Sequence, residues 1–289
     1  MPELPEVETV MRGLDMAMTG KTIRQVELRR KNLRFPFPEN FAGDLEGQRV
    51  TGLKRRAKYI QIHLASGKVL VSHLGMSGRF LINQAGTAGF HDEIPRKVAH
   101  DHVVITLSDG TLITYNDPRR FGYMLLVPES DLEQHPRFRD IGVEPLGNHL
   151  NEPFLNDAFR GRATSLKAAL MDQRIVAGLG NIYVCEALHM SSLSPERSAG
   201  SITTKSGAPG KRIAPLVTAI RDVLTRAIAA GGSSLKDFGH TDGSLGYFQH
   251  SFKVYDQAGE DCPRDRCKGT ILRIVQNGRS TFYCPVCQK

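Results

Sequence analysis

The sequence predicts an α+β protein with several domains: an N-terminal antiparallel β-sandwich with an N-terminal helix, then a helical domain, then a metal-bound β-hairpin. Three observations predict this fold class. Apolar residues have helical spacing at the start, alternate with polar residues from Thr22 to about Val127, and regain helical spacing after residue 152. Four of the five cysteines lie near the C-terminus, and 289 residues suffice for two domains with real cores.

Composition and charge limit the possible functions. Hydrophobic residues make up 40% of the chain, which excludes a disordered protein. There is no apolar run of about 18 residues and no charged-then-apolar signal segment, so we expect a cytoplasmic protein with no membrane partner. The net charge is +8, and between Lys21 and Lys58 eleven Lys or Arg residues stand against four Asp or Glu residues. This local excess favours a polyanionic partner.

The first six residues could carry chemistry. If Met1 is removed, Pro2 has a free secondary amine, and α-amino groups titrate at about 7.7–8.0. Such an amine can add to a sugar carbon and form an iminium, and the neighbouring Glu3 could move protons. The structural alternative is an ordinary helix start with proline and carboxylates in its first turn. The following helix, with apolar residues from Val7 to Met18 and a stop at Gly20, fits both interpretations.

Alternating segments predict the sandwich. Residues 58–64, 69–71, 102–107 and 112–115 read as strands, with turns at Ser66-Gly67 and Asp109-Gly110. Three polar clusters interrupt this pattern, at residues 55–58, 74–78 and 117–122. Many short strands joined by turns indicate an antiparallel sandwich or barrel.

Helical segments follow a linker that is rich in Pro, Gly, Asn and charge. Residues 165–171 form a short helix, Asn181 is the expected N-cap of a helix over 182–190, and a longer helix over 213–230 stops at Gly231-Gly232. We expect domains over residues 1–130, 153–250 and 251–289, with the linker at 131–152.

The C-terminal cysteines predict a structural zinc site. Cys185 stands alone in a helical pattern and is expected in the core. The other four form two pairs, Cys262-x4-Cys267 and Cys284-x2-Cys287, which can place four thiolates around one Zn²⁺ and leave no position for a catalytic water. A strand between the pairs turns at Asn277-Gly278, so Arg279 lies at a hairpin tip. Without further information, Arg279 is a solvated turn residue.

Several motifs occur together and in order: residues 1–6, the 74–78 loop, the 117–122 cluster, Gly180-Asn181-Ile182-Tyr183 and the C-terminal cysteines. As a set they closely resemble the bacterial formamidopyrimidine-DNA glycosylases, also called 8-oxoguanine DNA glycosylases, over essentially the whole chain. The resemblance implies a β-sandwich, a helix–two-turn–helix domain and a zinc finger. It also implies a monomer that excises oxidised purines from double-stranded DNA and cleaves the strand by β,δ-elimination.

The resemblance implies roles for four residues. Pro2 is the nucleophile that attacks C1′ and becomes the Schiff base, and Glu3 assists departure of the base and opening of the deoxyribose. Lys58 corresponds to the lysine of β-elimination and Arg279 to the arginine of δ-elimination. If Lys58 is buried beside Arg56, its pKa should fall, because desolvation and a neighbouring cation both oppose its charge.

The remaining implied residues contact DNA. Met76, Arg119 and Phe121 match the wedge that fills the hole left by the flipped nucleotide. On residue type alone, Met76 and Phe121 would be core residues, although the surrounding glycines favour exposed loops. Phosphate contacts are expected from His100, Arg119, Arg162, Lys167, Asn181 and Arg279. The lesion-capping loop, residues 233–248, offers Lys236 and Tyr247.

The sequence departs from the family pattern at two places, and two alternative functions remain. The first cysteine pair encloses four residues where many family members have two, so its knuckle must be wider. The 233–248 loop varies among members. An endonuclease VIII-like enzyme for oxidised pyrimidines shares the architecture, but Leu4 and the Arg119/Phe121 loop point to the purine branch. A non-catalytic DNA-binding relative would not need Pro2, Glu3 and Lys58 together.

Overall fold

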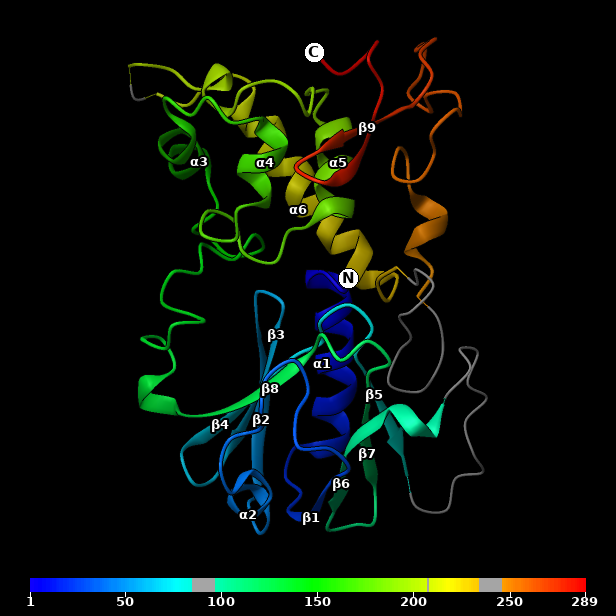
Figure 1. The fold of residues 1–289 in the computed structure, drawn as a ribbon. Coiled ribbons are helices and arrows are strands. Elements are labelled where there is room, and N and C mark those ends of the chain that lie inside the picture. The colour runs from blue at the N-terminus through cyan, green and yellow to red at the C-terminus, as the bar shows by residue number, and fades with distance from the viewer. Residues whose placement is uncertain (85–96, 207, 234–245) are drawn as a thin grey trace. The chain divides into compact units, whose positions relative to one another are not determined.

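The computed structural model describes residues 1–84, 97–206, 208–233 and 246–289, and these form two compact units (Figure 1). One unit contains Met1–Arg139 and Ile228–Gln249, and the other contains Asp140–Ala227 and His250–Lys289. The end of the long helix near residue 228 and the segment after it therefore group with the N-terminal unit. None of the described helices combines the length and the hydrophobicity that a membrane span requires.

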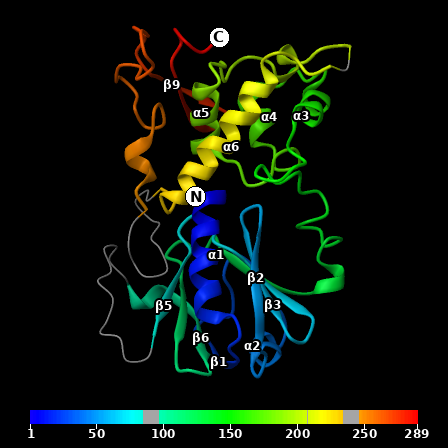
Figure 2. The same cartoon turned by 180° about the vertical axis from the view of Figure 1, so that it is seen from behind.

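The N-terminal unit begins with helix α1 (Leu4–Met18), whose first turn is fixed by a capping box between Glu3 and Glu6. The helix ends before Gly20, which has a φ of +83° that favours glycine. Its buried face includes Val7, Val10 and Leu14. This face packs against strands of two sheets, and Figure 2 shows the helix from behind.

Two four-stranded antiparallel sheets form the predicted sandwich. The first has the order β1-β6-β7-β5, with strands Ile23–Leu28, Asp101–Leu107, Leu112–Asn116 and Arg79–Asn83. The second has the order β2-β3-β4-β8, with strands Val50–Arg56, Tyr59–Leu64, Lys68–His73 and Tyr123–Pro128. A short helix, α2 (Phe41–Leu45), precedes β2.

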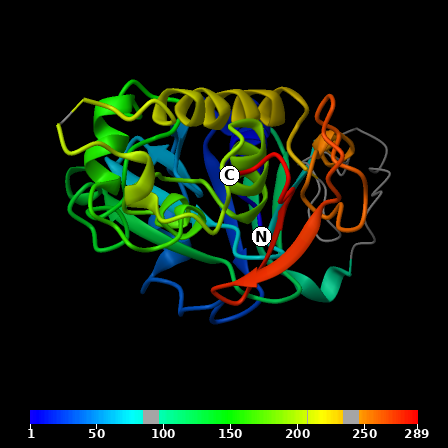
Figure 3. The same cartoon turned by 90° about the horizontal axis from the view of Figure 1, so that it is seen from above.

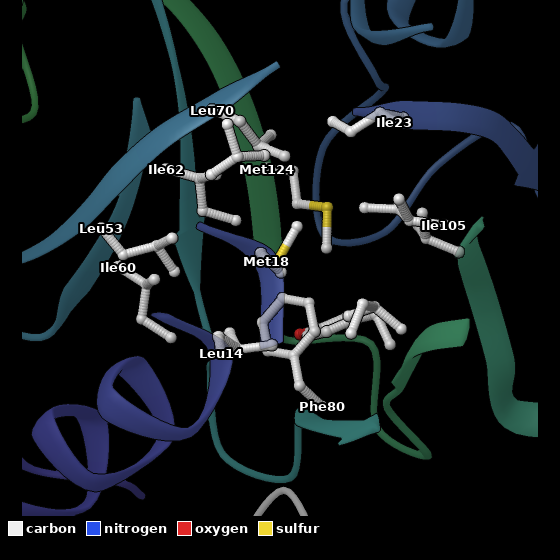
Figure 4. Close-up of a cluster of buried hydrophobic side chains, with 14 of the residues drawn as sticks. Leu14, Met18, Ile23, Leu53, Ile60, Ile62, Leu70, Phe80, Ile105 and Met124 are labelled. Atoms are coloured by element: carbon white, nitrogen blue, oxygen red, sulfur yellow. The ribbon is translucent and has the colours of Figure 1, made fainter. Parts of the chain in front are cut away.

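The core lies where α1 meets both sheets. Figure 4 shows Leu14 and Met18 of the helix among side chains from the two sheets. Ile60 is fully buried on the second sheet, and Phe80 and Ile105 are buried on the first. Burial of each such side chain stabilises the fold by about 1.5–3 kcal/mol, so this core holds the start of α1 rigidly.

The second unit contains the helices and the terminal hairpin. Its helices are α3 (Glu152–Phe159), α4 (Leu166–Met171), α5 (Asn181–Met190) and most of α6 (Ile213–Ala229). Figure 3 shows α6 as a long helix with the shorter α5 beside it. Strands β9 (Leu272–Gln276) and β10 (Arg279–Tyr283) pair in antiparallel register, and β10 contacts α5. Short 3₁₀ turns cover Val98–His100, Glu129–Asp131, Ala199–Ile202 and Phe248–Ser251.

Most predicted elements are confirmed, with one correction. Asn181 is not the N-cap of α5, because Gly180 has the extended cap conformation and Asn181 is the first helical residue. Its side chain instead donates to the Ser280 carbonyl at 2.8 Å. Ser165 does cap α4 by accepting from the Ala168 N–H. Cys185 is buried in a small cluster with Val254, Ile271 and Phe282, as expected.

Candidate active site and DNA interface

The N-terminal dipeptide is buried and held at the start of α1. Pro2 is buried, and Glu3 is 3% exposed. The Glu3 backbone N–H donates to Glu6 Oε2 at 2.8 Å. The other oxygen of Glu6 accepts from the Ser233 N–H at 2.8 Å and from the Ser233 hydroxyl at 2.9 Å. Glu6 therefore joins the helix start to the residue just before the 234–245 segment.

Lys58 lies in the two-residue turn between β2 and β3 and is 7% exposed, so the structure answers the question of its burial that the sequence left open. The preceding Ala57 has a φ of +53°, an unusual conformation for a residue with a side chain. Arg55 donates to the Ala57 carbonyl at 3.0 Å and to Glu8 of α1 at 2.8 Å. These bonds fix the Lys58 turn to the same helix that presents Pro2.

A pocket of about 630 Å³ adjoins the N-terminus. It is lined by Met1, Asn32, Leu33, Arg34, His73, Gly75, Met76, Arg119, Arg120 and Phe121. The pocket thus brings the chain start together with all three predicted wedge residues. Burial, followed by the charges of Lys58, Arg34 and Arg137, lowers the pKa of His73 to about 4. Its Nδ1 accepts from the Gly75 N–H at 3.1 Å, and its ring stacks on Tyr123.

The wedge residues are exposed, as the glycine-rich loops suggested. Met76 is 36% and Phe121 43% exposed, and the Arg119 guanidinium lies 4.9 Å from the Phe121 ring centre. A Cβ at Gly75 would lie 2.3 Å from the Phe121 carbonyl carbon. Only glycine permits this approach between the 74–78 and 117–122 loops. Large apolar side chains on adjoining loops suit insertion into a base stack.

In the second unit, Lys167 and Asn181 both hold the hairpin behind Arg279. Lys167 is 2% exposed and donates to the Ser280 carbonyl at 3.2 Å and to Thr281 Oγ1 at 2.5 Å. Asn181 donates to the same carbonyl, and its buried Oδ1 has no hydrogen-bond partner among the described residues. Arg279 itself is exposed at the start of β10, after a turn in which Asn277 and Gly278 both have positive φ.

The other predicted DNA contacts are dispersed. His100 is half-buried, and its carbonyl accepts from the Asp117 N–H at 3.0 Å. Arg162 is exposed and donates to the Ala158 carbonyl at 2.6 Å. Tyr247 is 66% exposed and forms a bridge with Ser233, whereas Lys236 lies outside the described residues.

The four C-terminal cysteines fit one zinc ion. Their sulfur atoms all lie within 4.8 Å of one another, with 3.7 Å between Cys262 and Cys287 and 3.6 Å between Cys267 and Cys284. Tetrahedral Zn–S bonds of about 2.3 Å require S···S distances of about 3.8 Å. His189 Nε2 lies 3.4 Å from Cys262 Sγ and can support that ligand. In the wider first knuckle, Arg264 donates to the His189 carbonyl at the end of α5.

Comparison with known families and proteins agrees with this geometry. Models of the formamidopyrimidine-DNA glycosylase N-terminal domain, its H2TH domain, and the zinc finger found in FPG and IleRS match residues 1–124, 141–239 and 259–289. The formamidopyrimidine-DNA glycosylase of Methylocella silvestris is 57% identical, and that of Nitrobacter winogradskyi 58%, each over 292 residues with 100% of both chains covered. The chain belongs to the formamidopyrimidine-DNA glycosylase family.

Solved structures of this family share the fold. Wild-type Lactococcus lactis Fpg in complex with DNA containing N7-benzyl-Fapy-dG has a TM-score of 0.84 at 33% identity, covering 100% of each chain. The same protein with DNA containing an oxidised pyrimidine has a TM-score of 0.84 at 34% identity and the same coverage. As a family member, the chain is a DNA glycosylase of base excision repair with abasic-site lyase activity and a zinc finger.

Sequence reasoning missed three residues that the structure places beside the predicted site residues. Glu6 entered only as part of the 1–6 motif, His73 was not singled out, and Asp117 entered only as part of the 117–122 cluster. Each acts through partners distant in sequence: Ser233 for Glu6, Tyr123 for His73 and Ser77 for Asp117. The available signal for His73 was its position directly before the Leu74–Gly78 loop.

Proposed function

We propose that the chain excises oxidised purines, such as formamidopyrimidines and 8-oxoguanine, from double-stranded DNA and then cleaves the abasic strand by β,δ-elimination. It acts as a monomer on this substrate. The observation that carries the proposal is the construction of the N-terminus. Pro2 and Glu3 are buried at the rigid start of α1, and Met1 lines a pocket together with three residues suited to fill a vacated base position.

Pro2 is the proposed nucleophile, and its amine becomes available only when Met1 is removed. The amine attacks C1′ of the flipped nucleotide, and a bond from nitrogen to C1′ forms as the glycosidic C1′–N bond breaks. The bonding electrons leave with the base, which takes up a proton. Glu3 assists this departure and the opening of the deoxyribose ring. The product is a cationic Schiff base between Pro2 and the sugar.

Strand cleavage follows because the cationic Schiff base withdraws electrons from the sugar and makes the C2′ proton more acidic. Loss of a proton from C2′ expels the 3′ phosphate, and loss of a further proton expels the 5′ phosphate. We assign Lys58 to the first elimination, which its burial on the β2–β3 turn supports. We assign Arg279 to the second elimination, which its exposed position at the hairpin tip supports.

The proposed DNA contacts fall into three groups: residues that fill the hole, residues that hold phosphates and residues of the lesion loop. Met76, Arg119 and Phe121 fill the hole in the duplex, and Arg119 hydrogen-bonds the orphaned cytosine. His100, Arg119, Arg162, Lys167, Asn181 and Arg279 hold phosphates. The α5 N-terminus offers backbone N–H groups for this purpose, and Lys167 and Asn181 also set the position of the hairpin. Lys236 and Tyr247 are the proposed contacts of the lesion loop.

The zinc ion is proposed to be structural, with Cys262, Cys267, Cys284 and Cys287 as its ligands. Four thiolates saturate the ion, so its chemistry is to cross-link the segment that carries Arg279. Because the substrate is the chromosome, we place the protein in the bacterial cytoplasm, associated with the nucleoid through DNA binding.

Excision of oxidised pyrimidines is a second candidate activity. It is favoured by the Lactococcus lactis complex, in which a family member binds DNA containing an oxidised pyrimidine. The two activities share the Pro2 chemistry and differ only in the base that the lesion pocket accepts. A non-catalytic role in DNA binding would leave the buried Pro2-Glu3 dipeptide and the buried Lys58 without purpose.

Borohydride trapping tests the proposal. Duplexes carrying 8-oxoguanine opposite cytosine, or an oxidised pyrimidine, are incubated with the enzyme and reductant, and covalent adducts are separated by size. The unmodified enzyme should yield an adduct with the purine lesion, and Pro2→Gly and Glu3→Gln should yield none. Met16→Ala is the matched control, because Met16 lies on α1, the helix that Pro2 and Glu3 precede, and is 83% exposed.

An adduct with the oxidised pyrimidine alone would assign the chain to the second activity. An unchanged adduct from Pro2→Gly would refute the proposed nucleophile. Loss of the adduct in Met16→Ala would show that any change in α1 blocks trapping, so the losses in the Pro2 and Glu3 variants would no longer support their roles.

A further inference from the structure

The two loops that carry the wedge residues are joined by a buried hydrogen-bond network. Met76 lies on the 74–78 loop, and Arg119 and Phe121 lie on the 117–122 loop. Between them, Ser77 Oγ donates to Asp117 Oδ1 at 2.6 Å. Asp117 is 0% and Ser77 3% exposed, so water does not compete for this bond.

Ser77 and Asp117 each make a second bond that ties the loops together. Ser77 Oγ accepts from the Arg119 backbone N–H at 3.2 Å, and Asp117 Oδ2 accepts from the Gly122 N–H at 2.9 Å. The segment that carries Phe121 is therefore anchored to the pair at Arg119 and at Gly122. A carboxylate that accepts charge-assisted bonds from neutral donors binds them about twice as strongly as an uncharged acceptor would.

Asp117 is in turn fixed to the sandwich. Its N–H donates to the His100 carbonyl at 3.0 Å, and its own carbonyl lies 2.9 Å from His102 Nε2. The Tyr115 hydroxyl lies 3.4 Å from Asp117 Oδ2 and fills the space that a Cβ at Gly78 or Gly122 would need. The network therefore transmits the rigidity of β6 and β7 to both loops.

We propose that Asp117 and Ser77 are positioning residues that hold Met76 and Phe121 as one preformed wedge. This inference rests on the proposed function, since it concerns how the void-filling residues act. Two independent loops would lose conformational freedom when they enter the duplex, and that loss would oppose base extrusion. Linked loops lose less freedom at that step.

The proposal predicts a defect that depends on the substrate. A duplex with 8-oxoguanine requires the wedge to displace a stacked base, whereas a ready-made abasic site requires no base extrusion. We expect Ser77→Ala to slow single-turnover excision of 8-oxoguanine by about tenfold or more, the effect of losing one buried charge-assisted hydrogen bond. Cleavage of the ready-made abasic site should change by less than about threefold.

Three further variants make the test decisive. Asp117→Asn keeps the shape but presents an N–H₂ group to Ser77 or to the Gly122 N–H, so it should show the same selective defect. Ser72→Ala is the matched control, because Ser72 is a buried serine of β4 whose hydroxyl finds no hydrogen-bond partner in the part of the chain that the structure describes. It should leave both rates unchanged. In a Met76→Ala, Phe121→Ala background, Ser77→Ala should cause little additional loss.

A spectroscopic signal reports the same step directly. With 2-aminopurine beside the lesion, the fluorescence increase on base unstacking should be slowed by Ser77→Ala as much as excision is. Equal losses on the lesion and on the abasic site would contradict the proposal, because they indicate a general structural role. An undiminished effect of Ser77→Ala in the wedge-deleted background would also contradict it. Failure of the parent enzyme to cleave either substrate would instead refute the proposed function.

Discussion

At the residue scale, the candidate site depends on carboxylates whose two oxygens have different partners. Glu6 accepts from the Glu3 N–H through one oxygen and from Ser233 through the other. A glutamine could serve one of these sides, but its N–H₂ group would then face a donor on the other side. The carboxylate can therefore accept hydrogen bonds from N–H and O–H groups through both oxygens, and it holds Glu3 and Ser233 at the same time.

His73 gives a pH-dependent prediction at this scale. Its pKa is about 4 in the fold, against about 6.5 when unfolded, because burial and nearby cations oppose its charge. Between these values the unfolded chain binds more protons, so the stability contributed by neutral His73 is present above pH 6.5 and is lost as the pH falls toward 4. The full change is about 3 kcal/mol.

Urea unfolding from pH 4 to 7 can measure this contribution. His73→Asn keeps an oxygen acceptor for the Gly75 N–H but cannot take up a proton. The stability of the parent should therefore fall more steeply than that of the variant between pH 6.5 and 4. Parallel curves for the two proteins would show that His73 titrates normally in the fold.

At the element scale, the zinc hairpin has little buried surface of its own on β9. Its strands are five residues each, and most of β9 is exposed. In zinc-finger peptides the metal supplies about 10–16 kcal/mol of folding free energy. The hairpin that carries Arg279 should therefore depend on the metal for its structure.

Metal analysis and DNA binding test this dependence. The parent should contain one zinc ion per chain, and Cys284→Ala should lose the ion and bind DNA at least about tenfold more weakly, because the hairpin loses its cross-link. Cys185→Ala, which removes a buried cysteine outside the site, should keep the ion. Full zinc content in Cys284→Ala would exclude Cys284 as a required ligand. Loss of zinc in Cys185→Ala would show that zinc binding also needs Cys185, which contradicts a site of only the four C-terminal cysteines.

The elements differ in how readily the sequence predicts them. Strands β3, β4, β6 and β7 follow from alternation and turn residues, and α1 and α6 from regular apolar spacing. Strand β2 contains Gly52 and three basic residues, so its pattern does not indicate a strand, although β3 and α1 cover it. Asn181 has the residue type of an N-cap, but its contact with Ser280 determines its role, and that partner is 99 residues away.

In the candidate site, too, contacts between residues far apart in sequence could not be predicted. The zinc cysteines were predicted from their spacing, and the roles of Pro2, Glu3 and Lys58 from the resemblance to the family. The Ser77–Asp117 and Glu6–Ser233 contacts were not predicted, because each joins segments that only the folded chain brings together.

At the scale of the whole molecule, the proposed chemistry is divided between the two units. Pro2, Glu3 and Lys58 belong to the N-terminal unit, and Arg279 and the zinc ligands belong to the second. The net charge of +8 suits a polyanionic substrate such as DNA. Base removal and the first elimination then rely on one unit, and the second elimination also requires the other.

Mass spectrometry of the N-terminal peptide tests the central claim most directly. An active preparation is divided, and one half is trapped with borohydride on 8-oxoguanine DNA before both halves are digested with protease and nuclease. The account predicts a peptide that begins at Pro2 in the free enzyme, and in the trapped enzyme the same peptide carrying a sugar remnant on the Pro2 nitrogen. A fully active enzyme that retains Met1, or a remnant on Lys58 instead, would contradict it.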